Sequence, residues 1–313
     1  QQRRRTPRSV RTWTEIPAVP INAFKDLTLS CAPPDDAARV FMTSGTTLGG
    51  VRGKSYHPTL RVYDASMRHN FAARFMRDRA RMRMGVLFPD CDAMPNSSLA
   101  HYLALAVAHF GGAHSRNLYP NGALDLDLAI EELAAAEVSG EPYALLGASF
   151  SFVHLLDEMA RQDRTVRLPA GSRLLDTGGF KGQSREIELD AFYDQLAERF
   201  GVARDDCVNM YGMTELSTQF YDAGNPVTPS VKSGPHWIRT RAVDPLSGDD
   251  VPFGETGVLV HCDLAHFNIV STILTEDAGA MTADGFLLHG RASGAEAKGC
   301  SLAVEEFLKA AGH

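Results

Sequence analysis

Short apolar runs alternate with amphipathic stretches from about residue 38 to residue 212. The run 84–88 is a predicted strand, because it is apolar and short and stops at a proline. One stripe recurs every four residues and predicts a helix: Tyr63, Met67, Phe71 and Phe75. The chain therefore changes period repeatedly, from strand to helix and back.

The same pattern gives the remaining elements of this region. The other predicted strands are 40–42, 117–119, 143–146, 173–175 and 207–211. The other predicted helices run from a cap at Ser97 or Ser98 to Phe110, over 125–137, over 151–162 and over 187–200. Strands that alternate with helices predict an α/β fold, a mostly parallel sheet with helices on both faces.

The pattern of apolar residues changes after Asn225, where prolines interrupt short apolar runs. The runs 258–260 and 286–288 are predicted strands, and one short helix is expected near 304–310. We therefore expect an α/β core over 1–225, a smaller β-rich subdomain of the same core over 226–290, and a short C-terminal tail over 291–313.

Composition and charge narrow the function classes. The chain has 313 residues with a formal net charge of −7, so a chain-wide basic surface for nucleic acid is not expected. It has no apolar run long enough to span a membrane and no signal-peptide pattern. The five cysteines are widely spaced without a C-x-x-C, which favours free thiols in a reducing cytoplasm over a zinc ribbon or a disulfide framework.

Candidate chemistry gathers where predicted strands end, which is where open α/β sheets bind ligands. The first such loop follows Met42 and is rich in hydroxyl groups and glycine: Thr43, Ser44, Gly45, Thr46 and Thr47. Hydroxyls and exposed backbone N–H groups suit a polyphosphate, which needs many donors in a small space. The alternative is a flexible polar loop without a ligand.

The second loop follows the strand 207–211. Tyr211 can stack a base, Thr214 can bond a phosphate, and Glu215 can hold Mg²⁺, a hard ion that takes oxygen ligands. The alternative is a strand end followed by a helix that Thr214 caps.

Together these segments resemble the adenylate-forming superfamily of acyl-CoA ligases. The matching runs are, in order, 41–47, 211–215, 254–257, 275–277 and 284–291. The resemblance implies an enzyme, a ligase that uses ATP and Mg²⁺ to join a carboxylic acid to AMP. Five matches in order make it specific.

The resemblance also assigns roles. It implies catalytic roles for Thr214, Glu215 and Lys54, with Glu215 as the metal ligand. It implies that the nucleotide contacts Thr43, Ser44, Gly45, Thr46, Thr47, Gly178, Gly179, Asn209, Tyr211, Gly212, Met213, Asp277 and Arg291. Within that set, Tyr211 would stack adenine, Asn209 would bond its edge and Asp277 would hold the ribose.

A narrower resemblance is to the acyl-protein synthetases of bacterial bioluminescence, carried by 175–182, 209–216 and 298–302. It implies that the acyl group passes to a thiol, for which Cys300 is the candidate, and that a reductase or an acyltransferase is a possible partner protein. A CoA ligase or carrier-protein loader of the phenylacetate-CoA ligase type is the nearest alternative. A non-catalytic nucleotide-binding scaffold is the third.

The chain departs from the superfamily pattern at three places. Leu48 replaces a glycine of the phosphate-binding loop, and Glu276 replaces the glycine of the Thr-Gly-Asp run. Only 22 residues follow Arg291, so we expect the usual C-terminal lysine domain to be absent.

Overall fold

The structure is a computed structural model that describes residues 6–44, 51–180, 182–293, 304 and 307–308. The chain divides into two compact units. Unit 1 comprises Gln1–Ser66, Met213–Thr218 and Ser233–His313, and unit 2 comprises Met67–Gly212 and Gln219–Lys232. This division differs from the predicted one, because the first 66 residues group with the β-rich part of the chain.

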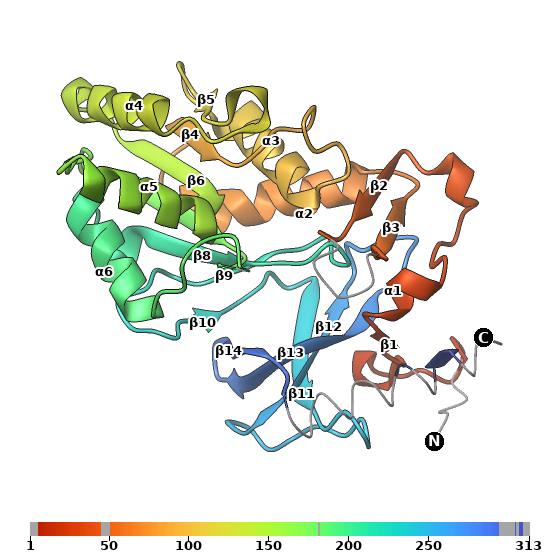
Figure 1. Cartoon of the computed structure of the whole chain (residues 1–313). Coiled ribbons are helices and arrows are strands. Elements are labelled where there is room, and N and C mark those ends of the chain that lie inside the picture. The colour runs from red at the N-terminus through yellow and green to blue at the C-terminus, as the bar shows by residue number, and fades with distance from the viewer. Residues whose placement is uncertain (1–5, 45–50, 181, 294–303, 305–306, 309–313) are drawn as a thin grey trace. The chain divides into compact units, whose positions relative to one another are not determined.

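Unit 2 contains a six-stranded sheet in the order β5-β4-β6-β7-β8-β9 (Figure 1). Its strands are β4 (Arg83–Leu87), β5 (Arg116–Asn117), β6 (Tyr143–Ala148), β7 (Arg173–Thr177), β8 (Cys207–Tyr211) and β9 (Phe220–Tyr221). All neighbouring pairs are parallel except β8 and β9, which are antiparallel. The prediction of a mostly parallel sheet is confirmed.

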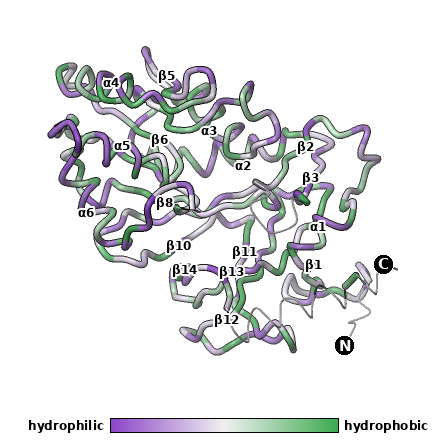
Figure 2. The backbone as a smooth tube through the Cα atoms, viewed as in Figure 1, coloured by the Kyte–Doolittle hydropathy of each residue, from purple (hydrophilic) through white to green (hydrophobic). Residues whose placement is uncertain are grey.

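Helices cover both faces of that sheet (Figure 1). They are α2 (Arg61–Phe71, which begins in unit 1), a π-helical turn (Ala72–Met76), α3 (Ser98–Phe110), α4 (Leu126–Ser139), α5 (Ser149–Arg161) and α6 (Leu189–Phe200). The last three share one core with β6 and β7, which includes Leu145, Leu174, Phe152 and Phe192. Hydrophobic and hydrophilic colours alternate along α5 and α6 in Figure 2, as expected for helices with one face on a core.

Unit 1 contains an antiparallel sheet in the order β14-β13-β12-β11. Its strands are β11 (Ile238–Val243), β12 (Thr256–Asp263), β13 (Thr272–Thr282) and β14 (Gly285–Arg291). The N-terminal strand β1 (Val19–Pro20) pairs in parallel with β13, which explains why the start of the chain belongs to this unit. The β-rich unit thus takes a strand from the N-terminal part of the chain as well as the four strands between residues 238 and 291.

The other elements are short. Unit 1 also holds α1 (Ala23–Asp26) and the antiparallel hairpin of β2 (Arg39–Met42) and β3 (Lys54–His57). Unit 2 ends in β10 (Val231–Lys232). Single 3₁₀ turns occur at Trp13–Glu15, Pro34–Asp36, Pro120–Gly122 and Arg204–Asp206.

Local signals placed several elements well. Ser97 caps α3, because its Oγ accepts a hydrogen bond from the N–H of Ala100 at 3.2 Å. Strand β8 has the predicted bounds. The predicted C-terminal helix falls mostly outside the described residues, although Val304, Phe307 and Leu308 are helical. Of the helices in the described part of the chain, none has the length and apolar character that a membrane crossing requires.

Candidate active site

The base of the predicted phosphate-binding loop is closed by two hydrogen bonds in unit 1. Thr43 follows β2 and Gly53 precedes β3. The N–H of Thr43 donates to the Gly53 carbonyl, and the N–H of Gly53 donates to Thr43 Oγ1, both at 3.0 Å. Ser44 and Lys54 are exposed, whereas Gly45, Thr46 and Thr47 lie outside the described residues. These hydrogen bonds hold the two ends of the loop together at its base.

Gly53 lies where Thr43 and Glu215 approach each other. A Cβ at this position would stand 3.2 Å from Glu215 Oε1 and 3.3 Å from Thr43 Cγ2, closer than side chains usually pack. Glycine therefore permits the approach of these two side chains. Sequence reasoning named Thr43 and Glu215 but missed Gly53, for which the only signal was a small residue at the end of the loop.

Burial dominates the electrostatics of Glu215. Only 4% of the residue is exposed, and desolvation raises the pKa of its carboxyl to about 7. A backbone hydrogen bond and the positive charges of Arg291 and Lys25 oppose that rise, and the negative charge of Asp277 adds to it. Glu215, Asp277 and Arg291 thus share one electrostatic neighbourhood in unit 1.

A buried carboxylate holds the segment that carries Glu215. Asp263 accepts hydrogen bonds from the N–H groups of Ser217, Thr218 and Ala265 at 2.9, 2.8 and 2.9 Å, and from Thr218 Oγ1 at 2.8 Å. Ser217 Oγ also lies 2.9 Å from Nδ1 of the buried His266. The alternative of a helix capped by Thr214 is wrong, because residues 212–219 form no helix: 214–215 are a turn and 217–218 a bend. Neither Asp263 nor His266 was singled out as a site residue from the sequence.

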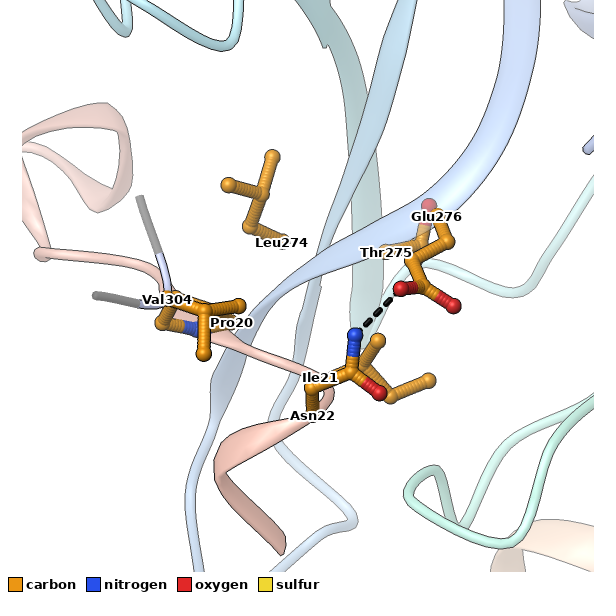
Figure 3. A pocket seen from close by; sticks show the side chains of 7 residues that line it. All are labelled: Pro20, Ile21, Asn22, Leu274, Thr275, Glu276 and Val304. Carbon is orange, nitrogen blue, oxygen red and sulfur yellow. Dashed lines mark hydrogen bonds between the residues drawn. The ribbon is translucent and has the colours of Figure 1, made fainter. Parts of the chain in front are cut away.

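The predicted ribose ligand lies beside Arg291 on neighbouring strands, since β13 and β14 pair Asp277 with Arg291. Arg291 Nη1 is 3.0 Å from Glu276 Oε2, and its Nε is 3.6 Å from Asp277 Oδ1. The amide of Asn22 donates to the other Glu276 oxygen (Figure 3). Glu276, which replaces the family's glycine, therefore holds Arg291 next to Asp277.

Figure 3 shows a small depression beside Glu276 in unit 1. It is lined by Pro20, Ile21, Asn22, Leu274, Thr275, Glu276 and Val304. It encloses almost no space, so it does not suit a whole nucleotide.

In unit 2, the two predicted glycines form a turn at the end of β7. Gly178 and Gly179 have φ angles of 85° and 75°, in the left-handed region that favours glycine. The N–H of Gly179 donates to Ser149 Oγ at 3.2 Å, which fixes this turn to the start of α5. The backbone here is therefore held in place, as a binding loop requires.

Asp176, two residues earlier, is 3% exposed and accepts three side-chain hydrogen bonds. The donors are Ser149 Oγ at 2.6 Å, Tyr193 OH at 3.0 Å and Asn209 Nδ2 at 2.9 Å. Burial raises the pKa of Asp176, and the hydrogen bonds from Ser149 and Asn209 oppose the rise. We call these four residues the Asp176 network. Its members are too far apart in the sequence for a local pattern to reveal it.

The strand that carries Asn209 and Tyr211 is held from a second side. Asp222 Oδ1 accepts the N–H of Asn209 at 3.0 Å, and Asp222 Oδ2 pairs with Lys232 Nζ at 2.6 Å. Tyr211 is 9% exposed, with its ring 5.9 Å from that of Phe220. Gly212 ends this part of unit 2, and Met213 begins the short segment assigned to unit 1.

The described residues contain no group of three or more His, Cys, Asp or Glu side chains that could hold a metal. None of the four cysteines that the structure describes forms a disulfide: Cys31, Cys91, Cys207 and Cys262. The candidate acceptor Cys300 lies outside the described residues.

Comparisons with solved structures identify the fold. The ATP-bound MatB of Rhodopseudomonas palustris superposes with a TM-score of 0.57 and 16% identity over 83% of this chain and 49% of that protein. A 2-hydroxyisobutyryl-CoA ligase in complex with 2-HIB-AMP gives a TM-score of 0.60 and 14% identity over 88% and 58% of the two chains. The chain thus spans about half the length of these enzymes and has the fold of adenylate-forming ligases.

Comparisons of sequence give the family. Long-chain-fatty-acid–luciferin-component ligases are 22% identical over 274 residues in Vibrio harveyi and 23% identical over 281 residues in Aliivibrio fischeri. These matches cover 86% and 87% of this chain and 70% of each relative. Residues 9–309 match the sequence model described as acyl-protein synthetase, LuxE. Since that match takes in nearly the whole chain, the protein belongs to the LuxE family of acyl-protein synthetases.

Proposed function

We propose that this chain uses ATP and Mg²⁺ to activate a long-chain fatty acid and then passes the acyl group to a protein thiol. Its family supports the ATP-dependent ligase activity, and the names of its relatives in Vibrio harveyi and Aliivibrio fischeri suggest the acid. One observation in the structure carries the proposal. Glu215 is buried against Gly53 at the neck of the predicted phosphate loop, in electrostatic range of Asp277 and Arg291.

In the first step, a carboxylate oxygen of the acid attacks the α-phosphorus of ATP. The new oxygen–phosphorus bond gives acyl-AMP, and the bond to the β-phosphate breaks to release pyrophosphate. Negative charge accumulates at the reacting phosphorus, so fixed positive groups and hydrogen-bond donors lower the barrier. We assign this work to Thr214, Lys54, Arg291 and the donors of Thr43–Thr47.

The surroundings of Glu215 fit a magnesium ion. Burial raises the pKa of this carboxyl to about 7 because its charged form has lost hydration. A bound cation would stabilise the charged form and so offset that loss. Magnesium commonly binds through one or two carboxylates and completes its shell with substrate phosphates and water. Glu215 would hold the ion, which when bound neutralises phosphate charge.

Other residues would position the nucleotide. Asp277 would accept hydrogen bonds from the ribose hydroxyls, Tyr211 would stack the adenine ring, and Asn209 would contact the edge of the base. The turn at Gly178 and Gly179 lets the backbone come close to the base or to the acyl carbonyl. These roles rest on the family resemblance and on the conformations described above.

In the second step, a thiolate attacks the acyl carbonyl carbon. A carbon–sulfur bond forms, the bond to the AMP oxygen breaks, and the thiol proton passes to solvent. Thiols are effective acceptors because a usable fraction is ionised near neutral pH. We assign the acceptor role to Cys300, from which a partner reductase or acyltransferase would take the acyl group.

Incubation with a radioactive long-chain fatty acid and ATP tests this proposal. The wild type should become labelled, Cys300→Ser should not, and both should exchange pyrophosphate into ATP. Cys31→Ser is the matched control, because Cys31 is exposed, and it should label like the wild type. Label that persists on Cys300→Ser would assign the acceptor role to another group, and formation of acyl-CoA instead would indicate a CoA ligase.

A further inference from the structure

The pairing of β7 with β8 places Asp176 directly beside Asn209. Partners in register on parallel strands present their side chains to the same face of the sheet. Here Asn209 Nδ2 donates to Asp176 Oδ2 at 2.9 Å, with a second contact of 3.4 Å to the Asp176 carbonyl. The amide nitrogen of Asn209 is thus occupied by two acceptors of one residue.

The other members of the Asp176 network show which way round this amide lies. Ser149 and Tyr193 direct hydroxyl groups at the Asp176 carboxylate, and Lys232 adds positive charge nearby. Both oxygens of Asp176 accept hydrogen bonds here, Oδ1 from Tyr193 and Oδ2 from Ser149 and Asn209, so the Asp176 side chain selects the NH₂ end of the Asn209 amide and turns its carbonyl end away. Among the described residues, no group donates a hydrogen bond to Asn209 Oδ1.

The backbone of Asn209 is fixed as well. Its N–H donates to Asp222 Oδ1 at 3.0 Å, and its carbonyl lies 3.4 Å from Lys232 Nζ. With backbone and amide nitrogen both held, the side chain has one orientation. Asn209 is partly exposed, and no described group donates to its carbonyl oxygen.

We infer that Asp176 is a specificity-determining positioning residue, which fixes the amide of Asn209 so that its oxygen accepts a hydrogen bond from the 6-amino group of adenine. This inference rests on the proposed function, in which Asn209 meets the edge of the base. Asp176 itself touches no nucleotide and acts through Asn209.

The chemistry of purines makes this orientation selective. Adenine carries an amino donor at position 6, whereas hypoxanthine and guanine carry a keto acceptor there. An amide oxygen facing that position pairs with adenine and opposes a keto oxygen. An amide nitrogen in the same place would reverse the preference, so the orientation of one side chain decides between ATP and ITP.

The test is the affinity for ATP and for ITP, measured by calorimetric titration of the full chain. In Asp176→Asn, the introduced amide can accept from Tyr193 and donate to Asn209, while Ser149 turns to the Thr177 carbonyl, 3.1 Å from its Oγ. The amide of Asn209 then reverses. We expect the preference for ATP over ITP to fall about tenfold or more, the scale of one hydrogen bond made or left unmade.

Two further variants give the test its controls. Tyr193→Phe removes a donor from Asp176 Oδ1 without touching the contact to Asn209, and it should keep the wild-type preference. The double variant Asp176→Asn with Asn209→Asp restores an acceptor at the base, because the introduced amide at position 176 donates to the carboxylate at position 209. It should recover the preference for ATP.

The outcomes separate this inference from the proposed function. The wild type should bind ITP at least about tenfold more weakly than ATP, and this measurement does not depend on whether any variant folds. Equal affinities in the wild type, or an unchanged ratio in folded Asp176→Asn, would overturn the role of Asp176 while pyrophosphate exchange continues to support adenylation. A wild type that binds neither nucleotide would overturn both.

Discussion

Two buried carboxylates, Asp176 in unit 2 and Glu215 in unit 1, have contrasting surroundings. Asp176 accepts hydrogen bonds from Ser149, Tyr193 and Asn209. Glu215 packs against Gly53, and within the described residues no side chain donates a hydrogen bond to it. Burial raises the pKa of both carboxyls, but side-chain hydrogen bonds from Ser149 and Asn209 oppose the rise only at Asp176, and the pKa of Glu215 stands at about 7.

This difference in hydrogen bonding distinguishes a carboxylate that positions other residues from one that can bind a ligand. A buried charge without enough hydrogen bonds or counter-charges destabilises the fold. Such groups are therefore found mostly at functional sites, where a bound ligand stabilises the charge. The oxygens of Asp176 are occupied by hydrogen bonds from Ser149, Tyr193 and Asn209, which Asp176 holds in position. Glu215 has acceptor capacity left for a ligand, which favours the assignment of the metal to Glu215 rather than to Asp176.

The largest effect should come from removing the charge of Glu215. Glu215→Gln keeps the shape of the side chain and should lower the rate of ATP–pyrophosphate exchange by roughly 10²–10³-fold, as losses of one charge-stabilising group do. Glu255→Gln, at an exposed position, is the matched control and should exchange at the wild-type rate. A fully active Glu215→Gln would remove the contrast between the two carboxylates.

The same residue should shape the pH dependence of stability. Its pKa is about 7 in the folded chain against an ordinary value of 4.5, so the folded state binds a proton that the unfolded state has released. The free energy of unfolding should therefore fall as pH rises from about 4.5 to about 7, by at most about 3 kcal/mol. Urea unfolding across this range should show the fall in the wild type, and a Glu215→Gln curve with the same slope would contradict it.

Asp263 should matter for folding. Asp263→Asn leaves some of its four donors without an acceptor in a buried place, which should lower the free energy of unfolding by about 2–3 kcal/mol. Urea unfolding measures the loss, with the exposed Asp284→Asn as the control. If Asp263→Asn were as stable as the wild type, Asp263 would not be what holds the Glu215 segment.

The smallest effect should separate Asp277 from its neighbour. Asp277→Ala removes the proposed acceptor for the ribose hydroxyls and should weaken AMP about tenfold or more. Glu276→Gln keeps its size and should change AMP affinity less, because Glu276 is engaged by Asn22 and Arg291. Calorimetric titration of AMP compares the two, and the reverse order would give the ribose to Glu276.

Periodicity and capping were enough to predict much of unit 2 from the sequence. Strand β8 and the cap of α3 at Ser97 came out as predicted, because both depend on neighbouring residues. The run Tyr211–Glu215 was recognisable because its residues are contiguous.

Contacts between distant residues could not be predicted. The pairing of β1 with β13 joins the start of the chain to residues 273 and 274, and no local period encodes it. The role of Gly53 depends on Glu215, which folds beside it. The role of Asp176 depends on its hydrogen bonds with Ser149, Tyr193 and Asn209. Such residues look ordinary in the sequence, since side-chain contacts across a fold leave no periodic trace.

Adenylation is the central claim, and ATP–pyrophosphate exchange by the wild-type chain tests it most directly. Purified protein is incubated with ATP, Mg²⁺, labelled pyrophosphate and one acid at a time, from a panel of long-chain fatty acids and aromatic acids. We predict exchange that requires an added acid and is fastest with a long-chain fatty acid. Binding of ATP without exchange for any acid would contradict the account and would indicate a nucleotide-binding scaffold.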